Sequence, residues 1–197
     1  MKTFLIVLIL IFSFQSISKA DDISEFEIEG MSIGDSALDF FSKEDLLKRK
    51  TYYNNTESKI FYRTSISSTK FNNYDNIMFH FKDNDSSFII HSISAAIWFS
   101  EDGIKNAEDC LVQRSKIDAE LIKLFKNLVR QVEDNDPHEG DKTGKSITHD
   151  IRYWFEEGHN AGVSCYILSK EFGGTSHLKV IVNSKELIGW INNVVYK

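Results

Sequence analysis

Long apolar runs and clusters of basic residues are both scarce in this sequence. After residue 14, no stretch approaches the roughly 20 consecutive apolar residues that a membrane-spanning helix needs, so we expect no transmembrane segment once the leader described below is removed. The 23 basic residues are outnumbered by 29 acidic ones, and no basic run is longer than Lys48–Lys50. Because nucleic-acid phosphates attract clusters of Lys and Arg, this balance argues against nucleic acid as a partner.

Complete motifs for the common catalytic and cofactor sites are also missing. Gly34–Leu38 is similar to the nucleophile block of the GDSL esterases, but no histidine has an aspartate three residues before it to act as that family's base. Gly140–Ser146 is one residue short of a phosphate-binding loop. The six histidines form no His-x-His or His-x-x-x-His pair of the kind that zinc sites use. We therefore assign no catalytic, cofactor-binding or metal-ligating residue.

One acidic segment keeps a metal-binding alternative open. Residues 133–141 are rich in carboxylates, as a calcium loop would be. Counted from Asp134, however, Glu139 stands where an EF-hand needs glycine and Lys145 where it needs glutamate. A looser calcium site and a solvated acidic loop both fit the sequence, and the solvated loop is favoured.

The first 20 residues have the three parts of a secretory signal peptide. Lys2 provides the basic start, residues 4–14 are apolar and uncharged, and Ser18 and Ala20 are small residues at the positions that a signal peptidase reads. Cleavage after Ala20 leaves residues 21–197, the length of one domain, and places the protein in the periplasm or outside the cell. An uncleaved membrane anchor is the alternative, but the apolar run is about half the length of a bilayer span.

Alternating apolar and polar residues predict an antiparallel sheet. Residues 76–99 read as a β-hairpin around the polar turn 83–86, because their apolar residues recur with a period of two. Residues 147–156, 163–168 and 177–182 are separated by glycine-containing turns and predict a three-stranded meander.

Two helices are predicted to pack on this sheet. Residues 106–132 carry an apolar stripe at helical spacing and lead into a polar surface loop that runs to Ser146. Ser184 can cap a C-terminal helix. Strands grouped with strands and joined by short turns indicate an α+β domain over residues 21–197. The fold expected is therefore a hairpin plus a three-stranded meander, packed by one long central helix and a C-terminal helix.

The two cysteines of the chain are expected to form a disulfide. Cys110 belongs to the apolar stripe of the predicted long helix, and Cys165 shares a strand face with Val163 and Ile167. Both thiols therefore point to the helix–sheet interface, in a protein whose expected compartment oxidises thiols. Two buried free thiols are the alternative.

Three aromatic residues are candidates for a binding face. Trp154 and Tyr166 lie on the strand faces opposite to Tyr153 and Cys165. If helices cover only one face of the sheet, these two residues and Trp98 form an exposed apolar patch, and such patches mark partner sites.

A resemblance covers nearly the whole mature chain. The segment Phe26–Ser36 running into Phe40–Ser42, together with Gly140–Ser146, is similar to a family of small exported proteins from AT-rich marine alphaproteobacteria. That family is uncharacterised, so the resemblance implies export to a bacterial envelope and transfers no catalytic residue.

These observations favour a non-enzymatic binding or interaction module of the periplasm, with an envelope protein or a small ligand as partner. The alternative is a small periplasmic hydrolase whose site is assembled from distant residues, with Ser164, His149 and His159 as candidates. A shared cleft that holds one of these histidines, a serine and a carboxylate would favour the hydrolase.

Overall fold

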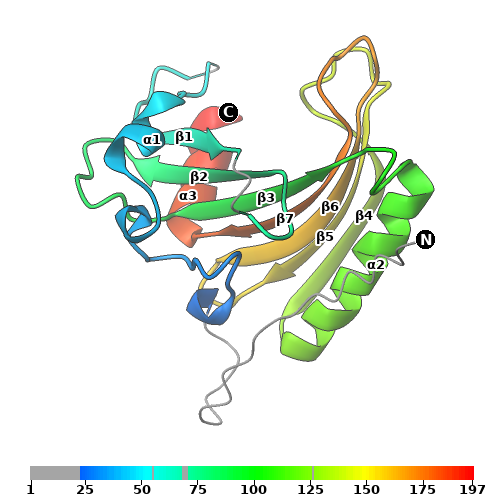
Figure 1. Ribbon diagram of the computed structural model, residues 1–197, viewed down its shortest axis with the longest axis horizontal. Helices are drawn as coiled ribbons and strands as arrows, with labels where there is room; N and C mark the ends of the chain where they lie inside the picture. The colour runs from blue at the N-terminus through cyan, green and yellow to red at the C-terminus, as the bar shows by residue number, and fades with distance from the viewer. Residues whose placement is uncertain (1–22, 55, 68–70, 126) are drawn as a thin grey trace.

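A computed structural model describes residues 23–197, apart from residues 55, 68–70 and 126. The predicted signal peptide lies outside these described residues. A seven-stranded antiparallel sheet forms the centre of the molecule (Figure 1). The strands follow the order β1-β2-β3-β7-β6-β5-β4, which brings β3 and β7 side by side although they are far apart in the sequence. The strands are β1 (Phe61–Ile66), β2 (Asn76–Lys82), β3 (Ser92–Trp98), β4 (Val129–Pro137), β5 (Ile147–Trp154), β6 (Asn160–Ile167) and β7 (His177–Asn183).

The helices begin at side-chain caps that the sequence supplies. Ser42, Asn106 and Ser184 each accept a hydrogen bond from the backbone N–H three residues later, which satisfies a donor at the helix start. The helices are α1 (Lys43–Lys48), α2 (Ala107–Leu124) and α3 (Lys185–Trp190), which continues into the π-helical turn η3 (Ile191–Val195); the short 3-10 turns are η1 (Ile23–Glu25) and η2 (Ala37–Asp39). Within the described residues, no helix has the length and apolar character needed to cross a membrane.

The sheet face that α2 covers carries the main hydrophobic core. Alternate strand residues such as Val163, Val180 and Ile93 point to this face and are buried. Burying each such side chain contributes about 1.5–3 kcal/mol. Phe26 and Met31 from the N-terminal segment complete the same cluster, so this face is closed by α2 together with the start of the domain.

The opposite face of the sheet, called the open face below, has a smaller apolar cluster at one end. There Leu187 and Trp190 of α3 and Val195 of η3 pack with Phe61 of β1. Figure 1 shows α3 behind β1, β2 and β3, on the side away from α2. The rest of this face carries polar and aromatic side chains, and these are described in the next subsection.

The α+β class and the antiparallel sheet predicted from the sequence are confirmed, but the layout differs. The hairpin and the meander belong to one seven-stranded sheet. The predicted helix 106–132 ends at Leu124, and residues 129–137 form the edge strand β4 instead of a helix end and a loop. The apolar spacing of Leu128 and Val132 fits a helix, but pairing with β5 and the reach of Arg130 to Asp118 favour a strand. The second hairpin strand, β3, starts at Ser92 because Phe88 and Ile90 instead bond the N-terminal segment.

The predicted disulfide is confirmed. Cys110 of α2 and Cys165 of β6 are bonded, with their Cα atoms 6.1 Å apart, and both side chains are buried. The bond joins the helix to the centre of the sheet, at the interface where the two sequence patterns placed the thiols.

Candidate functional site

Strand register arranges the side chains of the open face in rows. Trp98, His177 and Tyr166 are neighbours across β3, β7 and β6. The next row, two residues along each strand, consists of Ala96, Lys179, Ser164 and Asp150. Directly opposed residues have Cβ atoms about 4.5–5.5 Å apart. Members of a row that lie on adjacent strands are therefore close enough to contact each other.

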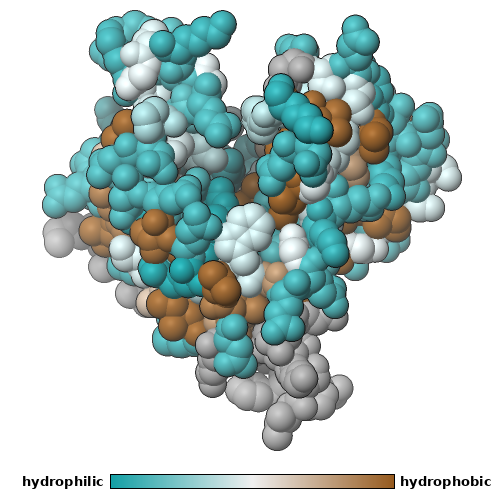
Figure 2. Space-filling model, turned by 180° about the vertical axis from the view of Figure 1, so that it is seen from behind, coloured by the Kyte–Doolittle hydropathy of each residue, from teal (hydrophilic) through white to brown (hydrophobic). Residues whose placement is uncertain are grey.

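This face of the molecule is hollowed. Figure 2 shows two raised parts with a hollow between them, and hydrophilic residues lie in its depth. Comparison with Figure 1 identifies one raised part as the β4–β5 and β6–β7 loops, and the other as the C-terminal end with the segment before β1. The strands between these parts form the floor of the hollow.

Lys179 lies on the open face of β7, the middle strand of the sheet. Its Nζ donates to the hydroxyl of Tyr166 at 2.6 Å and lies 4.1 Å from the centre of the Tyr166 ring. The Tyr166 ring also stacks on His177, with centroids 4.7 Å apart and planes 7° from parallel. Burial lowers the pKa of His177, although Nδ1–H donates to the Thr175 carbonyl, which acts in the opposite direction. A cation and two stacked rings therefore form one surface.

Beside Lys179, Ser164 and its two partners form a closed polar group. The Ser164 hydroxyl donates to Asp150 and accepts from Nη1 of Arg152 at 3.0 Å. Arg152 also forms an ion pair with Asp150 at 3.0 Å. Its guanidinium lies against Gly162, where an added Cβ would come within 2.9 Å of Nη1. The serine is fully buried and both of its hydrogen-bonding roles are taken, so it is poorly placed to act as a nucleophile.

His80 lies on the open face of β2, opposite Arg63 of β1. Its Nε2 shares a hydrogen bond of 2.9 Å with the Tyr53 hydroxyl, and the two rings stack. Burial, helped by the nearby cations Arg63 and Lys179, lowers the pKa of His80 to about 3. Burial likewise raises the pKa of Tyr53 to about 12. Both rings are therefore uncharged at neutral pH, and the buried Nδ1 of His80 has no hydrogen-bond partner among the described residues.

Two cations of the open face have no acidic partner in the described part of the chain. Arg63 lies over the Tyr53 ring at 5.3 Å, and Lys179 bonds only the Tyr166 hydroxyl and ring. Neither forms an ion pair, whereas Arg152 is neutralised by Asp150. The open face therefore carries two cations without an acidic partner among the described residues, in a protein with a net charge of −6.

The three aromatic residues proposed as a binding face do not form one patch. Trp98 and Tyr166 flank His177 in a single row. Trp154 lies opposite Asn160, six residues from Tyr166 along β6, which corresponds to roughly 20 Å. Its indole Nε1 donates to Gln131. Trp98 and Tyr166 thus share one row of the open face, and Trp154 lies away from that row.

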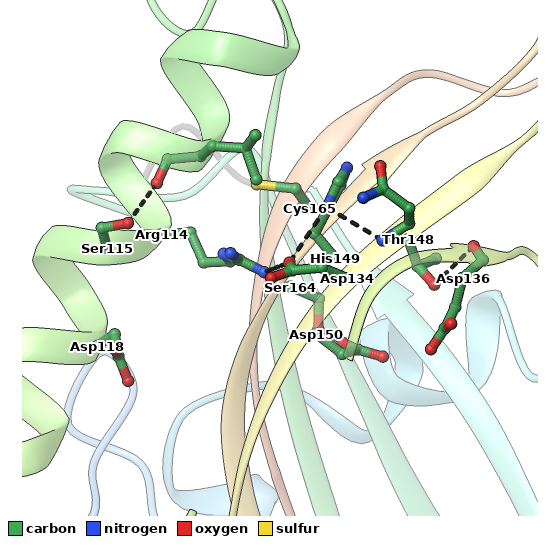
Figure 3. A network of polar contacts seen from close by, with 12 residues as sticks. Arg114, Ser115, Asp118, Asp134, Asp136, Thr148, His149, Asp150, Ser164 and Cys165 are labelled. Carbon is green, nitrogen blue, oxygen red and sulfur yellow. Dashed lines mark hydrogen bonds and ion pairs between the residues drawn. The ribbon is translucent and has the colours of Figure 1, made fainter. Parts of the chain in front are cut away.

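The hydrolase candidates are not brought together. Ser164 lies on the open face, whereas His149 lies on the opposite face, where its Nδ1 contacts Asp134 at 3.2 Å (Figure 3). His159 is in the β5–β6 turn, and its Nδ1 accepts from the Lys185 N–H.

One surface pocket does hold histidines, a serine and a carboxylate. It is lined by His91, His159, Ser184 and Glu186 together with apolar residues near Ile89. Nδ1 of His91 faces both Ser184, at 3.3 Å, and Glu186, at 3.7 Å. A catalytic histidine contacts its serine and its acid through different ring nitrogens, and Ser184 also caps α3. His159 also shares this pocket with Ser184 and Glu186, as the hydrolase alternative requires, but its Nδ1 accepts from the Lys185 N–H and its Nε2 faces Glu157 at 3.5 Å. Neither histidine therefore has the geometry of a relay to Ser184.

The weaker sequence motifs have structural roles. Ser36 of the GDSL-like segment caps η2 and donates to the Ser87 carbonyl. Asp141 of the glycine-rich segment accepts from Ser146, Thr143 and Ser169, and the hydrogen bonds from Ser146 and Thr143 lower its pKa.

The acidic segment 133–141 does not converge on a common point. Asp134 contacts Arg114, while Asp141 holds the β4–β5 loop. In the described residues, no group of three His, Cys, Asp or Glu side chains is placed to hold a metal ion.

Comparison with known proteins gives no further assignment. No family model, no curated protein and no solved structure matches this chain. The site therefore has to be interpreted from its own chemistry.

Sequence reasoning missed Lys179, His177, His80 and Arg63. Their polar positions in otherwise apolar strands were visible, since His177 and Lys179 alternate with Leu178 and Val180. The alternation identifies an outward face, but it does not show that these strands become neighbours or that their outward face is hollowed.

Proposed function

We propose that this protein is an exported binding module that holds a small ligand in the hollow of the open face and performs no chemical step on it. The observation that carries the proposal is the position of Lys179, which lies in the floor of the hollow beside the stacked rings of Tyr166 and His177. Binding sites combine flat apolar surfaces with a few placed polar groups, and this arrangement has that composition.

Two observations support export. The disulfide between Cys110 and Cys165 is of the kind that persists in oxidising compartments. The leader pattern of residues 1–20 and the resemblance to small exported alphaproteobacterial proteins favour the same location. Cell fractionation followed by N-terminal sequencing tests this part: we expect the mature chain to begin at Asp21 in the periplasmic or secreted fraction, and an intact N-terminus in the membrane fraction would contradict it.

A binding role is favoured over hydrolysis because the possible nucleophiles are already engaged. Ser164 is fully buried between Asp150 and Arg152. Ser184 caps α3, and its hydroxyl contacts Nδ1 of His91, the same nitrogen that faces Glu186.

Occupancy of the hollow can be tested with a variant that fills it. Ala96 is the neighbour of Lys179 across β3 and β7, so an Ala96→Trp side chain would occupy the floor. Val112→Trp is the matched control, since Val112 is exposed on α2, which covers the opposite face. The full chain, exported and purified without denaturation, is incubated with the small-molecule fraction of its host's envelope and weighed by native mass spectrometry.

We expect wild type and Val112→Trp to carry an added small-molecule mass, and Ala96→Trp to carry none. Circular dichroism confirms that both variants are folded. If Ala96→Trp retained the added mass, the ligand would bind outside the hollow, and the proposal would be contradicted. The absence of any added mass on the wild-type protein would also contradict it.

A further inference from the structure

The geometry points to a more specific ligand: a small molecule that carries an anionic group on a flat ring, with the anion at Lys179 and the ring on the row formed by Trp98, His177 and Tyr166. This inference rests on the proposed function, because it names the chemistry of the molecule held in the hollow. Its anionic group is a carboxylate or a phosphate ester. Its ring is aromatic, or it is a sugar ring, which is puckered but can lay its C–H face on an aromatic side chain.

The charges of the open face select an anion. Lys179 has three N–H donors, and one of them is used by Tyr166. Arg63 contributes a second cation without an acidic partner among the described residues, while Asp150 is already paired with Arg152. Glu133 and Asp136 lie on β4, at the far edge of the sheet. Glu139 of the β4–β5 loop is the nearer acidic side chain, because its charge, after burial, helps to raise the pKa of Tyr196 at the C-terminal end. An anion held at Lys179 itself therefore meets positive charge, although the whole chain is acidic.

His80 lies between these two cations in the strand order, with Arg63 on one side and Lys179 on the other. Burial lowers the pKa of this imidazole, and the charges of Arg63 and Lys179 act in the same direction. His80 therefore remains neutral and does not compete with Lys179 for an anion. Its uncharged ring stacks on Tyr53 and closes one side of the site.

A flat ring fits the row beside Lys179. Tyr166 and His177 are stacked nearly parallel, and Trp98, the next residue in the row, is 41% exposed. Large exposed aromatic faces attract planar or apolar ring surfaces. His177 of this row is two residues from Lys179 along β7, so one small molecule can contact both the row and Lys179. Lys179 supplies a compact charge that suits a carboxylate or a phosphate.

The test uses two pairs of probes that differ in charge. Phenyl phosphate is compared with phenol, and glucuronate with glucose; the first pair presents an aromatic ring and the second a sugar ring. The full chain, processed and purified from the envelope fraction, is labelled with ¹⁵N and titrated while the amide signals of residues 177–181 are followed. Lys179→Gln removes the proposed anion contact. Lys116→Gln is the charge-matched control, because Lys116 is exposed on α2, which covers the opposite face of the sheet.

We expect at least one anionic probe to shift these signals in wild type and Lys116→Gln with the same affinity. Lys179→Gln should bind that probe about tenfold or more weakly, the effect of losing one charged hydrogen bond. The neutral partner of the probe should bind at least as weakly to the wild-type protein. Whether phenyl phosphate or glucuronate is preferred identifies the ring.

Three outcomes would overturn the inference. Equal binding of the neutral and the anionic probe would show a ring site without charge selection, and the proposed binding function would stand. An equal loss of affinity in Lys116→Gln and Lys179→Gln would assign the effect to overall charge. If no probe binds, the proposed class of anionic ring compounds is wrong. The mass measured in the Ala96→Trp experiment then decides separately whether the hollow holds any ligand. The comparison of probes on the wild-type protein stands even if Lys179→Gln does not fold.

Discussion

Arg114 on α2 donates to Asp134 on β4 at 2.6 Å, and this ion pair fastens the edge strand to the helix (Figure 3). The guanidinium is largely buried, whereas the carboxylate is about half exposed and also meets His149. A second link, from Arg130 of β4 to Asp118 of α2, lies one helical turn away. Together the two pairs explain why α2 carries charged residues within its buried stripe.

Removing the carboxylate of Asp134 should destabilise the fold. Asp134→Asn leaves the buried Arg114 without its charged partner, and we expect a loss of about 1–3 kcal/mol in the free energy of unfolding measured with urea. Asp136→Asn, in the same strand, is the control, and it should change this free energy by less than about 0.5 kcal/mol. Equal effects of the two substitutions would show that the ion pair is not responsible.

The same pair predicts an acid dependence. The hydrogen bond from Arg114 lowers the pKa of Asp134 in the folded chain below the unfolded value of about 3.9. Its stabilisation is therefore present above about pH 4 and is lost as the pH falls further. Urea unfolding between neutral pH and pH 3 should show a smaller acid-induced loss in Asp134→Asn than in wild type, and parallel curves would count against this assignment.

Buried His80 predicts a second pH effect, which arises because folding stabilises the neutral form of this side chain and not its charged form. Its pKa in the folded chain is lowered to about 3, while the unfolded value is about 6.5. Between these values only the unfolded chain binds the proton, so stability falls by up to about 1.4 kcal/mol for each pH unit below about 6.5. In NMR, the His80 ring signals should remain those of a neutral imidazole from pH 7.5 to pH 4. A titration midpoint near pH 6 would refute this.

The disulfide should contribute a large share of the stability. It bridges a sequence separation of 55 residues, for which the chain-entropy model gives about 4 kcal/mol. The Cys110→Ala/Cys165→Ala protein should unfold at a correspondingly lower urea concentration. Alkylation of the denatured, unreduced wild-type protein should add no label, whereas two added labels would rule the bond out.

Gly162 should tolerate no side chain. A Cβ there would lie 2.2 Å from the backbone carbonyl oxygen of Ile151 and 2.9 Å from Arg152 Nη1. We expect Gly162→Ala to cost about 1–3 kcal/mol, as overpacking does. Gly189→Ala in α3 meets nothing within 4 Å and should be neutral or slightly stabilising, since alanine favours helix. Thermal melting of the two variants separates these outcomes, and a stable Gly162→Ala protein would contradict the close packing.

Local sequence determined the elements whose causes lie within a few residues. Ser184 starts a helix as predicted, and the alternation of apolar and polar residues located β2, β5, β6 and β7. The disulfide also followed from local patterns, because each cysteine could be assigned to the buried face of its own element.

Only the tertiary structure decided β4, the strand order and the hollow. Val129–Pro137 is a strand because β5 offers it a ladder of backbone hydrogen bonds and α2 offers Asp118 and Arg114 as partners. Lys179 meets Tyr166 because β7 pairs with β6, and His80 shares their face because β3 bridges β2 and β7. Sequence periodicity identifies which side chains leave a strand together, whereas the pairing of distant strands and the packing of the whole chain decide which of them meet.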